Sequence, residues 1–176
     1  MIDEIRKKFN IILIGFMGTG KSAVGAELAK LLGRKFIDTD DLIEIKTGMT
    51  VKEIFERYGE EFFRDRESEA AAHLLTYGQG ELIAATGGGI VLRKENRAVI
   101  KKAGKVILLK ASLPEILSRI GGCAGRPLLD REHPLETIKT MLEEREPYYI
   151  EYEISFDTTG KTVSEVCEEI MEKLQL

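Results

Sequence analysis

A glycine-rich segment near the amino end of the chain has the spacing of a phosphate-binding loop. Residues 15–22 read Gly-Phe-Met-Gly-Thr-Gly-Lys-Ser, directly after the apolar run 11–14. Glycines let the backbone N–H groups approach phosphate oxygens, and a helix beginning at Lys21 adds its positive end. Lys21 is a cation for the β- and γ-phosphates, and the Ser22 hydroxyl suits Mg²⁺. The segment predicts nucleoside triphosphate binding by Gly18, Thr19, Gly20, Lys21, Ser22 and Ala23.

Carboxylates follow the next apolar run, in the sequence Asp38-Thr39-Asp40-Asp41. If the strand continues through this segment, Asp38 and Asp40 point to the same side of the sheet because strand side chains alternate. One carboxylate would hold Mg²⁺ and the other would accept the proton of an acceptor hydroxyl. The alternative is that Asp40 or Asp41 caps a helix.

A second group of residues suits an anionic acceptor. Gly87, Gly88 and Gly89 stand where the third apolar run ends, and such a turn lets a ligand approach the backbone closely. Arg64, with Glu67 nearby, and Arg145 carry guanidinium groups that match a carboxylate or phosphate. Taken singly, each arginine also fits a solvated surface charge.

The elements that must position these residues alternate along the chain. Apolar runs at 10–15, 35–38, 82–86, 105–110 and 153–157 predict strands, with helical patterns between them. This alternation predicts an α/β fold with a five-stranded parallel sheet flanked by helices. The helix patterns cover 21–32, 41–46, a turn from a Thr50/Glu53 capping box through Tyr58, a longer helix after Gly59, 95–103, 113–120, 134–146 and 162–174.

One stretch has no sustained periodicity. Residues 121–131 contain three glycines, a proline and Arg126. In open parallel sheets ligands lie at the carboxyl ends of the strands, so a mobile basic loop there would exclude water from phosphoryl transfer. We expect a mobile lid, the alternative being a surface connection.

Composition excludes several classes of protein. With 176 residues, of which 43% are hydrophobic, the chain fits a single domain, residues 1–176. Its apolar stretches are strand-length, so we expect no membrane span and a cytoplasmic location. A net charge of −4 argues against a nucleic-acid surface, and we expect a monomer. Cys123 and Cys167 are expected to be reduced thiols, and His73 and His133 to be structural.

The ordered set of motifs closely resembles the shikimate kinase family, over residues 10–170. The set comprises the glycine loop with Lys21-Ser22, Asp38-x-Asp40, Phe63-Arg64 with Glu67, Gly87-Gly88-Gly89, Arg126-Pro-Leu-Leu and Arg145-x-Pro-Tyr-Tyr. The resemblance implies a P-loop kinase fold and the transfer of phosphate from ATP to shikimate, with Mg²⁺. It also implies acceptor-binding helices at about 41–77.

The resemblance implies roles for individual residues. Asp40, Arg64, Arg145 and the turn at 87–89 would hold shikimate, with Glu67 orienting Arg64. Ser22 and Asp38 would serve Mg²⁺. Lys21 and Arg126 would stabilise the transferring phosphoryl group, and Arg119 would lie against adenine; the catalytic residues are then Lys21, Asp40 and Arg126.

The match has one departure, and two alternatives stay open. Family members usually have proline where this chain has Val163, which affects adenine packing. A kinase of another small acceptor, such as gluconate or a nucleoside monophosphate, would use the same scaffold. A nucleotide-dependent switch would explain the glycine loop but not a second anion site.

Overall fold

The computed structural model describes residues 9–120 and 134–176, and its centre is one parallel sheet. The strand order is β2-β3-β1-β4-β5, and all four pairings are parallel, which confirms the predicted sheet. The strands are β1 (Ile11–Ile14), β2 (Lys35–Asp38), β3 (Leu82–Ala85), β4 (Lys105–Lys110) and β5 (Ile154–Asp157).

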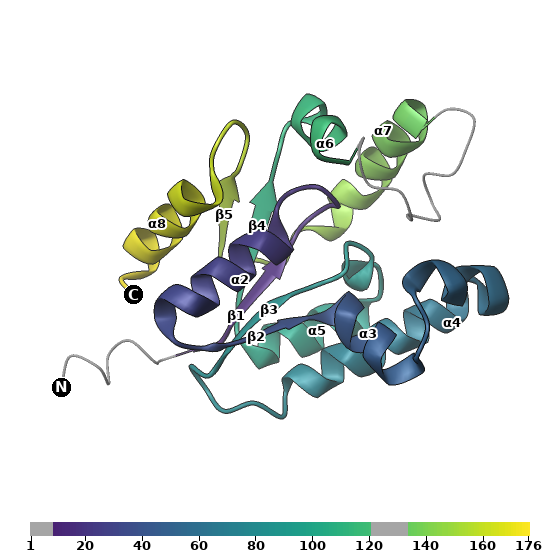
Figure 1. Ribbon diagram of the computed structural model, residues 1–176, viewed down its shortest axis with the longest axis horizontal. Coiled ribbons are helices and arrows are strands. Elements are labelled where there is room, and N and C mark those ends of the chain that lie inside the picture. Colours follow the sequence, from purple (N-terminus) through teal and green to yellow (C-terminus); the bar gives the residue numbers. More distant parts are fainter. Residues whose placement is uncertain (1–8, 121–133) are drawn as a thin grey trace.

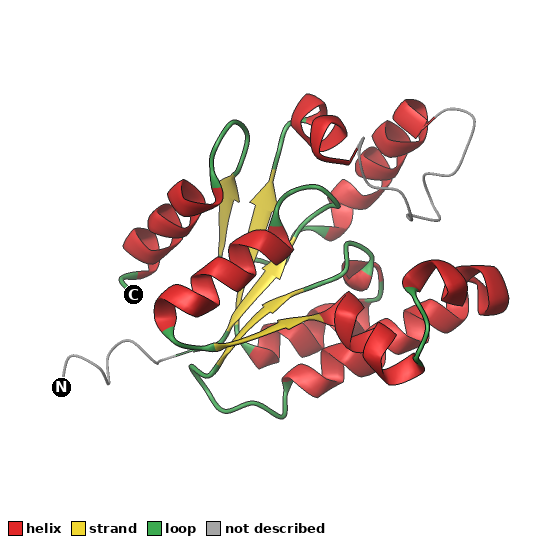
Figure 2. Cartoon of the chain, viewed as in Figure 1, coloured by secondary structure: helices red, strands yellow, loops and turns green. Residues whose placement is uncertain are grey.

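Helices cover both faces of the sheet (Figures 1 and 2). Because side chains alternate along a strand, Ile11 and Leu13 of β1 pack with α2 (Lys21–Leu32) and α8 (Val163–Leu174). Ile12 and Ile14 face the opposite cluster, with α4 (Val51–Leu74) and α5 (Lys94–Ala103). This burial on both faces explains why the strands read as continuous apolar runs.

The central strand β1 lies between β3 and β4, and the glycine loop follows it. The chain therefore leaves β1 where the strand order changes direction, which is where open α/β sheets bind ligands. At the same edge, α3 (Thr39–Thr47) follows β2, the turn 87–89 with the short helix η1 (Ile90–Leu92) follows β3, and α6 (Leu113–Ile120) follows β4. The glycine loop, Asp40, the turn 87–89 and Arg119 thus follow strand ends along one edge.

The end of β2 differs from the prediction. The strand stops at Asp38, and α3 begins at Thr39, so Asp40 lies in the first turn of a helix. The expectation that Asp38 and Asp40 share one strand face is wrong. Asp38 ends the strand because its side chain accepts a hydrogen bond from the Asp40 backbone N–H and caps α3. The capping residue is therefore Asp38, and not Asp40 or Asp41.

Helix α4 consists of two segments with a break at Gly59. Gly59 has φ 79° and ψ 178°, outside the helical region and suited to glycine. The capping box of Thr50 and Glu53 begins the first segment, as predicted. In the second segment Phe63 is buried, whereas Phe62 stacks on the ring of Tyr58.

The carboxyl-terminal part supplies the last elements. Helix α7 (Pro134–Arg145) leads into the short helix η2 (Glu146–Tyr148). The predicted lid at 121–131, including Arg126, lies outside the described residues. Among the helices of the described residues, none has the length and apolar character needed to cross a membrane.

Candidate active site

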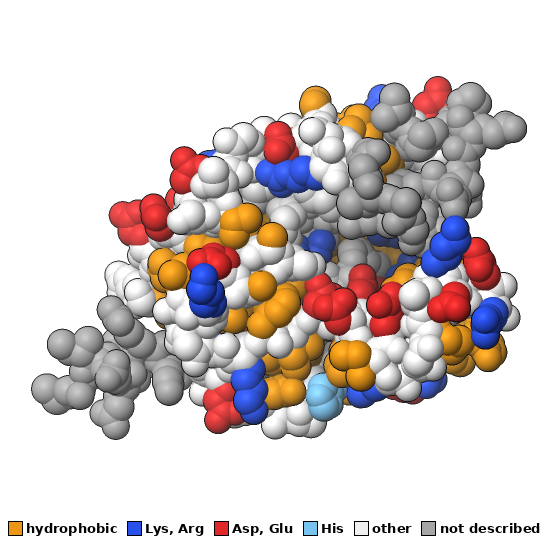
Figure 3. Space-filling model, in the orientation of Figure 1, with side chains coloured by type: hydrophobic (Ala, Val, Ile, Leu, Met, Phe, Trp, Pro, Cys, Tyr) orange, Lys and Arg blue, Asp and Glu red, His pale blue; other side chains and the backbone are white. Residues whose placement is uncertain are grey.

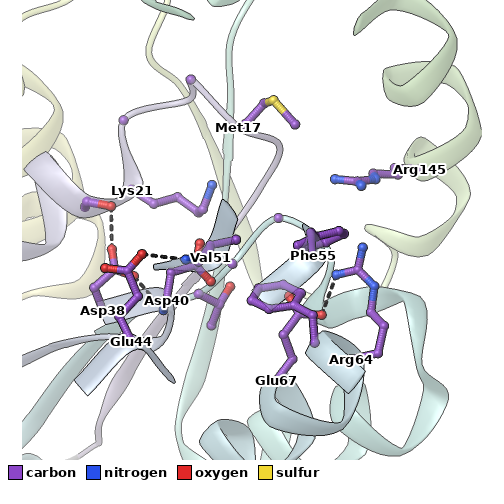
Figure 4. Close-up of a pocket in the computed structure, with 18 of the residues that line it drawn as sticks. Met17, Lys21, Asp38, Asp40, Glu44, Val51, Phe55, Arg64, Glu67 and Arg145 are labelled. Carbon is purple, nitrogen blue, oxygen red and sulfur yellow. Dashed lines mark hydrogen bonds and ion pairs between the residues drawn. The ribbon is translucent and has the colours of Figure 1, made fainter. Parts of the chain in front are cut away.

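A cavity of about 480 Å³ opens at the carboxyl edge of the sheet. Figure 3 shows this hollow with acidic side chains beside it, and Figure 4 shows its lining. The glycine loop, α3, α4, the turn 87–89 and Arg145 of α7 all contribute. The cavity brings together Gly18, Gly20, Lys21, Ser22, Ala23, Asp38, Asp40, Arg64, Gly87, Gly88, Gly89, Arg119 and Arg145, all of them predicted from the sequence.

The glycine loop has the conformation that its sequence requires. Gly15, Gly18 and Gly20 have φ of 146°, 78° and 92°, and a side chain at Gly15 would collide with the carbonyl of Leu109. Lys21 is only 8% exposed, and its Nζ donates a hydrogen bond of 2.8 Å to the carbonyl of Phe16. The ammonium group is thereby held against the loop.

Thr19 is the predicted phosphate-loop residue whose side chain does not line the cavity. It is buried, and its hydroxyl donates to the carbonyl of Phe16 at 2.7 Å. Its carbonyl accepts a hydrogen bond from Thr158 at 3.1 Å. The Thr19 backbone N–H also donates to the Phe16 carbonyl, at 3.4 Å. Thr19 therefore fixes the loop and does not itself line the cavity.

Ser22 and Asp38 lie together beside the loop. The Ser22 hydroxyl donates to Asp38 Oδ2 at 2.5 Å, while Asp38 Oδ1 accepts from the Asp40 backbone N–H at 3.0 Å. A hydroxyl and a carboxylate oxygen are the hard ligands that Mg²⁺ accepts, with water and phosphate completing its shell. No group of three or more His, Cys, Asp and Glu side chains forms a metal cage within residues 9–120 and 134–176.

Arg64 enters the opposite side of the cavity between two glutamates. Its Nη1 donates to Glu67 Oε2 at 2.5 Å, and its Nη2 donates to Glu60 Oε1 at 2.7 Å. Burial raises the pKa of Glu67, and the charges of Arg64 and Arg145 offset part of that shift. These contacts fix the direction of the Arg64 guanidinium.

Arg145 approaches from α7 and points towards the same space (Figure 4). Its side chain is buried and lies over the ring of Phe16, with 5.7 Å between Cζ and the ring centre. Burial, together with the charge of Arg64, lowers the pKa of Arg145. Within the part of the chain that the structure describes, no hydrogen bond engages its guanidinium. Its donors are therefore available to an anion in the cavity.

The turn 87–89 packs tightly against the acidic and basic side chains. A Cβ at Gly87 would lie 2.9 Å from Glu67 Oε1 and closer still to Asp40 Oδ1, and a Cβ at Gly89 would overlap Arg64. None of the three glycines has a positive φ. Close approach of this chain's own side chains therefore requires glycine at positions 87 and 89, whereas the sequence had predicted an approach by ligand.

Arg119 of α6 marks the other end of the cavity. Its guanidinium donates to the carbonyls of Gly18 at 3.2 Å and Thr158 at 2.8 Å, and it pairs with Glu115 at 2.9 Å. It thus connects the glycine loop to the segment that follows β5. Val163 is the first residue of α8, directly after the helix cap at Thr162.

The family model for shikimate kinase matches residues 17–175. The chain belongs to the shikimate kinase family. A shikimate kinase of Thermodesulfovibrio yellowstonii is 46% identical over 166 residues, which cover 94% of this chain and 95% of that protein. A shikimate kinase of Geobacter sulfurreducens is 45% identical over 161 residues, covering 92% and 88%.

Solved structures agree with this assignment to the shikimate kinase family. The shikimate kinase of Acinetobacter baumannii in complex with shikimate superposes with a TM-score of 0.92 at 36% identity, covering 98% of this chain and 96% of that chain. A gluconokinase from Sinorhizobium meliloti gives a TM-score of 0.57 at 19% identity, covering 97% and 93%. The second likeness shows a shared fold only.

The structure adds cavity residues that sequence reasoning missed in this member of the shikimate kinase family. Val51 and Phe55 form an apolar wall, Met17 lies above it, and Glu44 accepts a hydrogen bond from the Val51 backbone N–H at 2.8 Å. Val51 and Phe55 are one helical turn apart, so their common face was visible in the sequence. The sequence did not indicate that this face lines a cavity, because apolar residues at this spacing usually pack into a core.

Proposed function

We propose that the protein transfers the γ-phosphoryl group of ATP to the 3-hydroxyl of shikimate, giving shikimate 3-phosphate and ADP. The observation that carries this proposal is that one cavity is lined by a phosphate-binding loop, by Asp40 and by two buried arginines, Arg64 and Arg145. Family membership supports the same reaction. The reaction is a step towards chorismate and the aromatic amino acids.

The glycine loop and Lys21 would bind the triphosphate. Backbone N–H groups of residues 18–23 surround the phosphates, and the Lys21 ammonium moves from the Phe16 carbonyl to the β- and γ-oxygens. Ser22 and Asp38 would hold Mg²⁺, directly or through water. When bound, the metal ion neutralises charge on the phosphate oxygens.

The acceptor would lie between α4, α7 and the turn 87–89. Arg145 and Arg64 bind the carboxylate of shikimate, since planar guanidinium groups match its two oxygens. Asp40 accepts a hydrogen bond from the reacting hydroxyl and takes its proton. Glu67 keeps Arg64 in place through its 2.5 Å contact. Rate enhancement then comes mainly from positioning and from charge stabilisation.

The remaining roles are also proposals. Arg119 would lie against adenine, at the end of the cavity where it already contacts the glycine loop. Arg126, in the lid at 121–131, would stabilise the transferring phosphoryl group. We propose one domain over residues 1–176, with acceptor-binding helices at about 41–77, and a monomeric cytoplasmic enzyme that binds neither nucleic acid nor membrane.

A coupled assay of ADP release tests the proposed reaction against its alternatives. Shikimate, gluconate and AMP are each supplied with ATP and Mg²⁺, because kinases of related fold act on different small acceptors. We expect ADP release with shikimate only. ADP release with gluconate or AMP alone would establish another acceptor, and binding of ATP without transfer to any acceptor would favour the nucleotide-dependent switch.

A further inference from the structure

Tyr149 is a buried titratable residue beside the proposed substrate site, and the proposed mechanism does not use it. Its side chain is 9% exposed and belongs to the same core cluster as the helices on that face of the sheet. Its hydroxyl donates a hydrogen bond of 2.8 Å to the carbonyl of Gly88, in the middle of the turn 87–89. The contact joins segments 61 residues apart in the sequence.

Gly88 lies where the two halves of the cavity meet. A Cβ built on it would be 3.5 Å from the backbone nitrogen of Met17 in the glycine loop, and 3.6 Å from Arg145 Nη1. On the other side of the turn, the Gly87 N–H donates to the Thr39 hydroxyl at 2.9 Å. The turn is therefore held to α3 through Thr39 and to the segment after α7 through Tyr149.

The chain between Arg145 and Tyr149 is short and rigid. It forms the helix η2, which contains Pro147, and the Tyr149 N–H donates to the Glu146 carbonyl at 3.1 Å. Arg145 and Tyr149 thus flank one rigid segment, and both side chains reach the turn 87–89. Arg145 approaches it with its guanidinium group, and Tyr149 contacts it with its hydroxyl. Burial raises the pKa of Tyr149 above its ordinary value, so the hydroxyl keeps its proton and stays a donor.

We propose that Tyr149 is a positioning residue that fixes the distance between Arg145 and the turn 87–89, through its hydrogen bond to Gly88. This role rests on the substrate site proposed above, where Arg145 binds the carboxylate and the acceptor lies between α7 and the turn 87–89. A ligand held at both ends needs the two ends at a fixed spacing. Loss of the hydroxyl therefore weakens acceptor binding and leaves the nucleotide half unchanged.

The test compares Tyr149→Phe with a replacement of Tyr149 by 4-aminophenylalanine, which keeps a donor at the same ring position. Tyr148→Phe is the matched control, because Tyr148 is 40% exposed and forms no part of the cavity described above. Ile138→Ala, in the buried face of α7, controls for a general loss of stability. Each variant is assayed for shikimate KM, ATP KM, kcat and melting temperature.

We expect Tyr149→Phe to raise the shikimate KM roughly three- to tenfold, the effect of losing one partly buried hydrogen bond to a backbone carbonyl. ATP KM and kcat should stay within about twofold of wild type. The 4-aminophenylalanine protein should recover most of the shikimate affinity, and Tyr148→Phe should match wild type. Should Tyr149→Phe fail to fold, the 4-aminophenylalanine protein is compared with one carrying 4-fluorophenylalanine, which has similar size and no donor.

Two results would overturn the role of Tyr149 while leaving the proposed function intact. One is an unchanged shikimate KM in a folded protein without the hydroxyl. The other is that Ile138→Ala raises the shikimate KM as much as Tyr149→Phe does, while the two variants lose the same amount of melting temperature. The rise in KM would then reflect a general loss of stability and not the missing hydrogen bond. If the wild-type protein does not phosphorylate shikimate, the proposed function fails and the role of Tyr149 fails with it.

Discussion

Replacing Arg145 by lysine separates the shape of the guanidinium group from its charge. Arg145 is 8% exposed, lies over the ring of Phe16 and points into the cavity. Lysine keeps the positive charge but offers an ammonium group in place of a planar fork with parallel donors. The substitution therefore removes one of two parallel hydrogen bonds to a carboxylate.

The expected size of the effect follows from that lost bond. A hydrogen bond between charged groups contributes about 1 to 3 kcal/mol, which corresponds to a roughly 5- to 150-fold rise in the Kd for shikimate. The fold should lose little stability, because no carboxylate among the described residues is hydrogen-bonded to Arg145. Arg64→Lys should weaken shikimate binding similarly but also lower the melting temperature, since Glu60 and Glu67 both bond Arg64.

Calorimetric titration of shikimate and of ATP measures both effects. Arg97→Lys is the matched control, because the Arg97 side chain is also mostly buried and donates to the Val91 carbonyl at 2.7 Å outside the cavity. We expect weaker shikimate binding and unchanged ATP binding in Arg145→Lys, and no change in Arg97→Lys. Unchanged shikimate affinity in both Arg145→Lys and Arg64→Lys would refute the carboxylate clamp.

Three further predictions concern the rest of the cavity. Lys21→Ala should lower turnover by about three orders of magnitude or more without unfolding the protein, because it removes a cation from the transferring phosphate, and near wild-type turnover would contradict the role of Lys21. Asp40→Asn should reduce turnover more than ATP affinity, whereas Asp38→Asn should mainly raise the Mg²⁺ concentration required; identical Mg²⁺ titrations would remove this division of roles. Because burial raises the pKa of Glu67, its contribution to stability is fully present below the unfolded value of 4.5 and is lost as pH rises through the folded pKa. Denaturant unfolding should therefore show Glu67→Gln gaining stability relative to wild type as pH rises from about 4 to 8, and the opposite trend would contradict the shift.

The fold was predictable because it is indicated by two local features of the sequence, the apolar runs and the glycine loop. Continuous apolar runs indicate strands buried on both faces, and the glycine loop after the first run fixes which edge binds the ligand. The end of β2 was not predictable to the residue. Asp38 can extend a strand or cap a helix, and the hydrogen bond to the Asp40 N–H that decides between them forms only when the chain turns.

Most residues that line the cavity were predicted from their types and order, but their contacts were not. The sequence indicated that a ligand approaches the glycines at 87 and 89. It did not indicate their packing against Asp40, Glu67 and Arg64, because that packing depends on how α3 and α4 lie against the sheet. Tyr149 belongs to the motif Arg145-x-Pro-Tyr-Tyr, but its contact could not be predicted, because its partner is the backbone carbonyl of Gly88, far away in the sequence. Such long-range contacts with the backbone carry no pattern in the sequence.

The central claim is transfer of phosphate to shikimate in this cavity. Phosphorus NMR of a reaction with ATP, Mg²⁺ and shikimate measures this transfer most directly, and the Lys21→Ala variant serves as the inactive control. We predict a new phosphomonoester signal that grows in equal amounts with ADP, depends on shikimate and disappears in Lys21→Ala. ADP formation that is independent of shikimate, or a phosphomonoester formed equally well by Lys21→Ala, would contradict the claim.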